Sequence, residues 1–414
     1  MSSRFRTIVF WLHLAAGLTV GAVVLVMSVT GVLLMYEQQI IEWSNRGYRS
    51  APPPEASPLP VEALIGRVVA EHPETTPSSF TMEADPAAPA SVRLGRERTV
   101  YLNRYTGEIL GEGSPGVRSF FHAVTDWHRW LAAGDDNRSV GRAVTGAANL
   151  AFLFLVVSGF YLWIPRKWSW RQVRNVTWFR RGLPGKARDF NWHNVIGLWM
   201  AVPLFLVVLS AVLISYPWAN DVLFRLVGEE PPPRRGAGGP ERPRGGGGAQ
   251  PGREARSQEA AGVKLDGLDE LWARAERQVP GWKTLSLRLP EDAGDPVTFT
   301  INQGGRGRVD LRAQLALDRQ SGEVERWEPY ASQSLGRKLR SWARWVHTGE
   351  AGGVLGQTLA GLASAGGAVL VWTGAALAWR RFVPKRRRRT VPEADEGLSE
   401  DSFSIHQGES HSRG

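Results

Sequence analysis

Four long apolar stretches constrain this chain more than any other feature of its sequence. They run over about residues 8–36, 141–164, 195–218 and 354–379, and each can cross the roughly 30 Å hydrocarbon core of a bilayer as a helix. The mean hydropathy of -0.22 hides this segregation because polar segments lie between the stretches. The first stretch leads into Glu37 without a small-residue cleavage pattern, so we expect an uncleaved helix and not a signal peptide. The sequence therefore predicts a membrane protein, mainly α-helical, with four transmembrane helices.

Basic residues next to these stretches predict the orientation of the chain. Lysines and arginines crowd the loop 165–192, whose only acid is Asp189, and they follow the last stretch from Arg380 onward. By the positive-inside rule, this loop and both termini are expected to be cytoplasmic, with 37–140 and 219–350 outside. The expected location is a bacterial inner (cytoplasmic) membrane. The formal charge of +10 fits contact with anionic membrane lipid and predicts no nucleic-acid partner.

Four histidines lie beside the apolar stretches, at two depths. His13 and His193 begin two of them, and His128 and His347 lie just upstream of the other two. Histidine near a bilayer is costly and serves as a ligand, a proton carrier or a satisfied polar contact. The absence of cysteine excludes thiolate-bound metal and c-type haem. Two histidine pairs predict two b-type haems, whose filled axial positions favour outer-sphere electron transfer over oxygen binding.

Side chains near the histidines have more than one interpretation. Gly17 and Gly197, one turn after their histidines, would let a flat macrocycle lie against either helix, although such glycines also permit close helix packing. Arg129 and Arg344, with Arg340 nearby, would pair with haem propionates or attract an anionic ferric chelate, and interface anchoring explains them equally well. His122 would point away from the face of His128, as a plain interfacial histidine, an alternative ligand or a propionate partner. The sequence thus gives four candidate haem-iron ligands and two candidate cofactor-binding arginines.

The chain also repeats itself. Residues 100–110 and 315–325 share a strand, a polar turn with glycine and a second strand, and a histidine follows each at a similar interval. Ser158-Gly159 likewise resembles Thr373-Gly374, each before a tryptophan and basic residues. We therefore expect an internal two-fold repeat in which each half is a helix, a small α+β extracytoplasmic module and a second helix.

The expected organisation follows from these patterns. The first module is predicted to contain a helix at 60–72 and strands near 91–94 and 99–102, and the second a helix at 265–278 and strands near 284–289, 297–302 and 314–317. The predicted boundaries are transmembrane helix 1 at 1–36, the first module at 37–118, a juxtamembrane segment and helix 2 at 119–164, the basic loop at 165–192, helix 3 at 193–218, a flexible Gly/Pro/Arg-rich insert at 219–262, the second module at 263–335, a juxtamembrane segment and helix 4 at 336–383, and a disordered tail at 384–414.

The order and repetition of these motifs resemble a known family. Residues 13–17, 30–33, 127–130 with 141–142, 192–194 and 347–349 together look like the PepSY-associated transmembrane helix family, over nearly the whole chain except the insert and the tail. Its members include iron-regulated inner-membrane proteins and siderophore-iron reductases. The resemblance implies two periplasmic PepSY-like modules and b-type haems on helix histidines.

These expectations combine into a prediction of function. The chain is expected to be an oxidoreductase, a transmembrane reductase of a ferric siderophore or another ferric chelate on the periplasmic side, which releases iron for uptake. No Gly-rich dinucleotide fingerprint follows a predicted strand, so the expected electron donor is a quinol or a cytoplasmic flavoprotein. Two alternatives remain open: a membrane regulator or inhibitor of an extracytoplasmic peptidase, and a haem subunit that delivers electrons to a partner protein.

Overall fold

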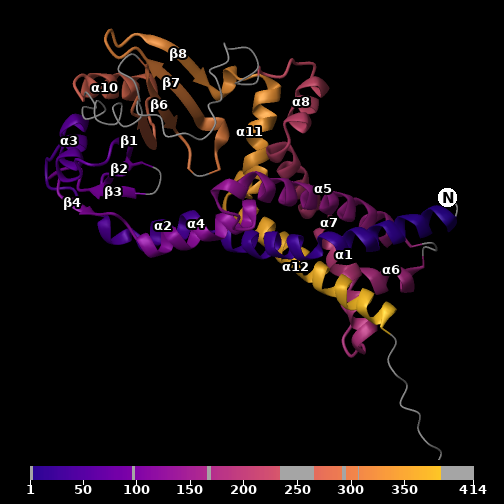
Figure 1. Cartoon of the computed structure of the whole chain (residues 1–414). Helices are drawn as coiled ribbons and strands as arrows, with labels where there is room; N and C mark the ends of the chain where they lie inside the picture. Colours follow the sequence, from indigo (N-terminus) through magenta and orange to yellow (C-terminus); the bar gives the residue numbers. More distant parts are fainter. Residues whose placement is uncertain are drawn as a thin grey trace, which may run out of the picture.

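The computed structural model describes residues 3–95, 98–165, 169–233, 265–290, 295–305 and 307–383. These residues form a bundle of long helices joined at one end to a single β-sheet (Figure 1). The tail expected at 384–414 and most of the insert expected at 219–262 lie outside the described residues.

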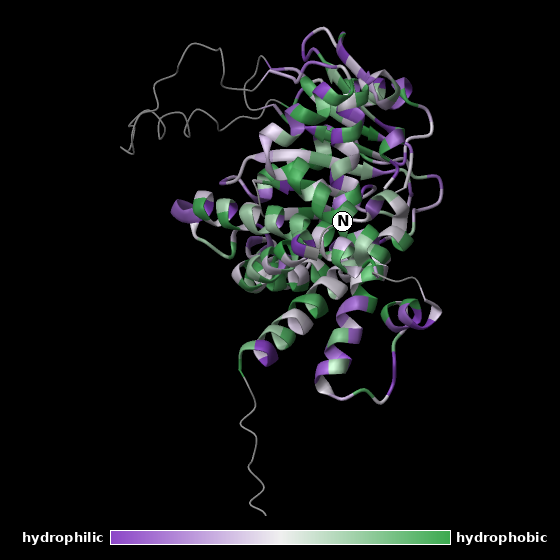
Figure 2. Ribbon diagram, turned by 90° about the vertical axis from the view of Figure 1, so that its right-hand side faces the viewer, coloured by the Kyte–Doolittle hydropathy of each residue, from purple (hydrophilic) through white to green (hydrophobic). Residues whose placement is uncertain are grey.

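Four helices of the bundle are long and apolar enough to cross a membrane, as the sequence predicts. α1 and α7 lie at opposite corners, and each contacts both α5 and α12. Apolar residues dominate the four ribbons (Figure 2), which suits helices with lipid on one side and protein on the other. The chain is therefore a multi-pass membrane protein. Its spans are α1 (Ser3–Leu34), α5 (Arg138–Trp163), α7 (Gly185–Ser215) and α12 (Gly353–Phe382).

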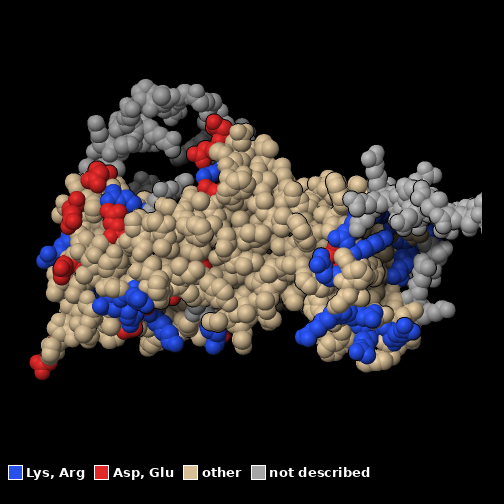
Figure 3. Space-filling model, turned by 90° about the horizontal axis from the view of Figure 1, so that it is seen from below, with Lys and Arg blue, Asp and Glu red and all other residues tan. Residues whose placement is uncertain are grey.

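The two ends of the bundle differ in charge and in what they carry. α1 begins and α12 ends at one end, where α6 (Trp170–Thr177) also lies between α5 and α7. Lys and Arg side chains gather there, at the right of Figure 3, beyond a band with few charged groups. We call this the basic end. The opposite end joins the sheet, and we call it the sheet end.

The basic end is more ordered than its polar sequence predicts. The third span was expected to begin at residue 193, whereas α7 begins two turns earlier, at Gly185. Asp189 on this extension is 4% exposed and pairs with Arg380 of α12 at 3.0 Å. Asn191, also 4% exposed, donates to the carbonyls of Asn175 and Trp178 and so holds the end of α6. Buried polar partners therefore continue the helix where the sequence alone predicts a loop.

Short helices connect the bundle to the sheet. α4 (Pro115–Trp130) leads into α5, and α11 (Leu335–His347) leads into α12. α2 (Glu37–Ser44) follows α1, and α8 (Pro217–Leu226) follows α7. The α8 helix occupies residues that the sequence assigns to the flexible insert from 219. It is ordered because Phe224, 2% exposed, packs so closely on Gly336 of α11 that a Cβ there would meet its ring at 2.6 Å.

The sheet has eight antiparallel strands in the order β4-β3-β2-β1-β5-β6-β7-β8. The helices α3 (Val61–Glu71) and α10 (Leu268–Gln278) pack on one face and confirm the two predicted module helices. β4 and β8 are the second strands of the repeats predicted at 100–110 and 315–325, whereas β1 was not predicted. The strands are β1 (Pro77–Glu83), β2 (Ala90–Leu94), β3 (Arg98–Leu102), β4 (Ile109–Gly111), β5 (Thr284–Arg288), β6 (Val297–Asn302), β7 (Arg312–Leu317) and β8 (Val324–Pro329).

The two expected modules are joined into one body, which the sequence does not predict. β1 pairs with β5, with Phe80 opposite Leu287, so the sheet runs without a break from one half of the chain to the other. Phe80 is fully buried and makes an edge contact with Trp272 of the other half, with ring centroids 5.2 Å apart. Without this pairing β1 and β5 would be exposed edge strands, which invite association. The strand pairing and the shared core therefore join the two halves of the chain in one continuous sheet.

Candidate functional site

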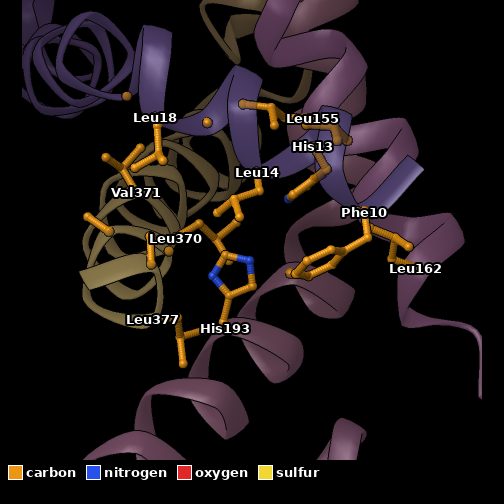
Figure 4. A pocket seen from close by; sticks show the side chains of 18 of the residues that line it. Phe10, His13, Leu14, Leu18, Leu155, Leu162, His193, Leu370, Val371 and Leu377 are labelled. Carbon is orange, nitrogen blue, oxygen red and sulfur yellow. The ribbon is translucent and has the colours of Figure 1, made fainter. Parts of the chain in front are cut away.

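The structure brings the four histidines together in two pairs, each formed across the two halves of the chain. His13 of α1 and His193 of α7 face a common cavity at the basic end (Figure 4). His128, at the end of α4, and His347, at the end of α11, lie side by side at the sheet end. We call these the basic-end pair and the sheet-end pair. The pairing and the two depths agree with the sequence-based expectation.

The basic-end pair borders a cavity of about 900 Å³ among α1, α5, α7 and α12. This volume lies at the upper end of the range for ligand sites, and its walls are largely apolar. Gly17 and Gly197 line it as expected, and a Cβ on either would only touch a leucine, at 3.8 and 3.7 Å. These glycines therefore leave room on the cavity side of both helices.

A hydroxyl group orients each histidine of the basic-end pair. His13 Nδ1 lies 2.8 Å from Ser158 Oγ, and that hydroxyl donates its own proton to Phe154 O at 2.6 Å. His193 Nδ1 lies 2.9 Å from the hydroxyl oxygen of Thr373, which donates one turn back along α12 at 2.8 Å. Because each hydroxyl proton is already used, the hydroxyl accepts from Nδ1–H. The remaining nitrogen, Nε2, is then the unprotonated one and is available to a metal.

The glycines after these hydroxyl residues lie against the histidine rings. A Cβ on Gly159 would lie 3.2 Å from His13 Cε1, and one on Gly374 would lie 3.5 Å from His193 Cε1. The sequence shows Ser158-Gly159 and Thr373-Gly374 as a repeated motif. In the structure each motif contacts one histidine of the same cavity, through a hydroxyl on Nδ1 and a glycine beside the ring. Their role in orienting histidine was not predicted.

The sheet-end pair has the same protonation pattern. His128 Nδ1 lies 2.9 Å from Thr30 Oγ1, whose proton goes to Val26 O at 2.7 Å. His347 Nδ1 donates to Val207 O at 3.0 Å, a carbonyl that can only accept. Both Nε2 atoms are therefore unprotonated here as well.

The spacing of the sheet-end rings fits one metal ion between them. Their centroids are 6.2 Å apart, and the ring planes are tilted by 50°. An imidazole nitrogen lies about 2.0–2.1 Å from a bound first-row metal ion, so two imidazoles on opposite sides of one ion place their centroids about 6 Å apart. Within the described residues no group of three or more His, Asp or Glu could hold an ion alone. Paired imidazoles suit an ion whose other ligands come from a macrocycle, as in haem.

Cationic side chains accompany both pairs. Arg6, Lys186 and Arg381 line the basic-end cavity, and the Arg381 guanidinium lies 4.9 Å from the Trp11 ring centroid. At the sheet end, Arg129 follows His128 directly and lies within electrostatic range of Arg344. Such groups match the carboxylates of a haem. The residues present at both ends therefore fit b-type haem.

The other residues considered in the sequence lie apart from the pairs. His122 is exposed on α4 and lies 3.5 Å from Asp126, one turn further along that helix. This contact is the one expected of an interfacial histidine. Arg340 is exposed on α11. The structure also places a residue that the sequence gave no reason to choose within electrostatic range of Arg344. This is Arg312 of β7, an exposed arginine whose pKa is lowered by partial desolvation and by the Arg344 cation.

Comparison with known proteins bears on the whole bundle. The family described as the PepSY-associated TM region matches residues 10–381, which include most of α1, nearly all of α12, the whole of α5 and α7, both histidine pairs and the sheet. No match to a curated protein was found.

Proposed function

Because the chain belongs to the PepSY-associated TM region family, we propose that it is a di-haem oxidoreductase that reduces a ferric chelate at the sheet end. One observation carries the proposal: four histidines form two pairs at opposite ends of a membrane bundle, and every Nδ1 is engaged so that every Nε2 is left for a metal. A structural role alone would not require the same tautomer four times.

The proposal includes the orientation and the architecture. We place the basic end in the cytoplasm and the sheet outside a bacterial inner membrane, because basic residues accumulate at that end and around it. We also assign the two halves of the sheet, each a helix with four strands, to two PepSY-like modules related by an internal two-fold repeat. Ser158 is hydrogen-bonded to His13 within the first half, and Thr373 is hydrogen-bonded to His193 within the second. This correspondence supports the repeat.

The chemistry requires one electron for each iron released. Bound haem at each end would supply one-electron redox chemistry without an open coordination position. The histidines would hold the haem iron through Nε2, and their hydroxyl and carbonyl partners orient the rings. Reduction of Fe(III) to Fe(II) in the chelate weakens its hard oxygen ligation, which frees the iron. A quinol or a cytoplasmic flavoprotein would supply the electron from the basic end.

Purified protein in detergent tests this directly. We expect a reducible b-type haem spectrum, and we expect the dithionite-reduced protein to be reoxidised rapidly when mixed anaerobically with a ferric siderophore in a stopped-flow instrument. The His347→Ala variant is the matched comparison, because it should lose the sheet-end haem and most of the chelate-dependent reoxidation. Haem-loaded wild-type protein that stays reduced with every ferric chelate would refute the reductase and favour electron delivery to a partner protein.

A further inference from the structure

The short helix α6 is fixed beside α7 at the basic end (Figure 1). Trp199 of α7 donates its indole proton to Thr177 O at 3.0 Å, and Asn191 donates to the carbonyl of Trp178 at 3.1 Å. At about 3.6 residues per turn, Asn191 and Trp199 lie on the side of α7 away from His193. The α6 helix therefore packs on the side of α7 that faces away from the basic-end cavity.

Further along the same side of α7, apolar side chains face outward. Trp199 is 60% exposed, and Val202 and Leu206, which follow it at helical spacing, are 67% and 47% exposed. Apolar side chains that a membrane-spanning helix exposes face the hydrocarbon chains of the lipid. The α6 helix therefore lies where the basic end meets the lipid-facing side of the bundle, at the depth of the phospholipid headgroups.

The outward face of α6 combines tryptophan with arginine. Trp170, Arg174 and Trp178 follow each other at intervals of four residues, so they share one face of the helix, and Arg171 lies beside them. We call these four residues the α6 face. Its two tryptophans are 75% and 61% exposed, and both arginines are exposed. This combination is typical of the headgroup layer, where an aromatic ring contacts lipid and a cation contacts phosphate.

Among the residues that the structure describes, no carboxylate pairs with the two arginines of the α6 face. Residues 165–188 contain no Asp or Glu. The next acid, Asp189, is already paired with Arg188 and with Arg380, at 3.0 Å each. Two exposed cations without a carboxylate partner attract an anion from outside the protein, and a phosphate group accepts paired, charge-assisted hydrogen bonds from guanidinium.

We propose that the α6 face binds an anionic phospholipid of the membrane leaflet at the basic end. The two guanidinium groups would hold the phosphate, and an acyl chain would lie along the exposed apolar side of α7 from Trp199 to Leu206. An anionic headgroup is favoured over a zwitterionic one because it brings a net negative charge to the arginines. The proposal depends on the membrane position of the bundle and not on haem, so it can be tested separately from the proposed electron transfer.

Lipid binding by the full-length protein in a neutral detergent tests the proposal. Native mass spectrometry counts the phospholipids that stay bound when phosphatidylglycerol, an anion, or phosphatidylcholine, a zwitterion, is added. We expect phosphatidylglycerol to bind more tightly, and we expect Arg171→Gln and Arg174→Gln each to weaken its binding about fivefold. Binding of phosphatidylcholine should weaken less. Arg4→Gln is the matched control, because Arg4 is an exposed arginine at the same end of the bundle but on α1, and its loss should leave the affinity unchanged.

Two further measurements separate a phospholipid from other occupants. Trp170→Ser should also weaken phosphatidylglycerol binding, because the interfacial ring is lost, and inorganic phosphate at the concentration of the lipid should not displace it. An equal loss of affinity in Arg4→Gln would indicate general attraction to the basic end and would overturn the site. Displacement by inorganic phosphate would overturn it too. Phosphatidylglycerol binding that no substitution on the α6 face changes would also refute the proposal, and would favour a soluble partner for this face.

Discussion

Removing the Thr373 hydroxyl should weaken the haem of the basic-end pair without touching the other. In Thr373→Val the shape of the side chain is kept, but the acceptor 2.9 Å from His193 Nδ1 is lost. The Nδ1–H is then left without a partner beside an apolar cavity, and the ring is free to rotate away from the position in which Nε2 faces that cavity.

Two independent estimates give the size of the effect. An unpaired buried donor costs about 1–3 kcal/mol. Loss of the group that orients a metal-binding histidine lowers metal affinity about 10–100-fold, which corresponds to about 1.4–2.8 kcal/mol. We therefore expect the affinity for one haem to fall about 10–100-fold. The Ser158→Ala change should do the same through His13, because that histidine is held in the same way.

Haem transfer to apomyoglobin, followed by absorbance, measures this affinity. Thr19→Val is the control, since Thr19 on α1 makes the same bond to a carbonyl one turn back, at 2.9 Å, but is not bonded to a histidine. Thr30→Val should instead weaken the second haem, through His128. If Thr373→Val releases haem no faster than Thr19→Val, the hydroxyl does not orient a ligand and the assigned tautomer is wrong.

Three further predictions follow from other parts of the molecule. Alanine in place of either histidine of the basic-end pair should remove one and the same haem, and in the sheet-end pair the other; two haems in every variant, counted by pyridine haemochromogen, would contradict the pairing. Reporter fusions after Ser114 and after Asp310 should both register outside the cytoplasm, and an inside signal from either would reverse the orientation. Glu229 accepts from Ser334 and from the Gly336 N–H, which hold its pKa below the ordinary 4.5, so its stabilising contribution is present above pH 4.5 and disappears as the pH falls through the lowered pKa. Thermal melts at falling pH should therefore show a steeper acid loss in wild type than in Glu229→Gln, and parallel curves would disprove the contribution.

Local signals predicted the helical part of the fold well. The four spans were predictable because apolar runs of that length have few alternatives, and they are confirmed. The helix predicted at 60–72 and the strand-turn-strand at 100–110 also form, as α3, β3 and β4. The two depths of histidine follow from the position of each histidine along or beside its span.

Long-range partners explain what the sequence did not reveal. β1 has the sequence PSSFTME, which is weakly apolar, and it becomes a strand because it pairs with β2 and with β5 from the other half. The early start of α7 depends on the ion pair that Asp189 makes with Arg380 of α12. Each of these partners is distant in the chain, and no local pattern identifies it. The repeated Ser-Gly and Thr-Gly motif was visible, but its meaning required the histidines opposite.

Each histidine pair takes one member from either half of the chain, so a haem bound by both members would also hold the two halves together. Neither half contains both histidines of a pair, and haem would therefore favour states in which the two halves are docked. A ligand that binds only the assembled form stabilises it by an amount that grows with the logarithm of ligand concentration over Kd. A cell short of haem would then hold a more loosely closed protein, whose halves outside the membrane stay joined by the β1–β5 pairing and the shared core of the sheet. A shortage of haem would therefore also lower the stability of the folded protein.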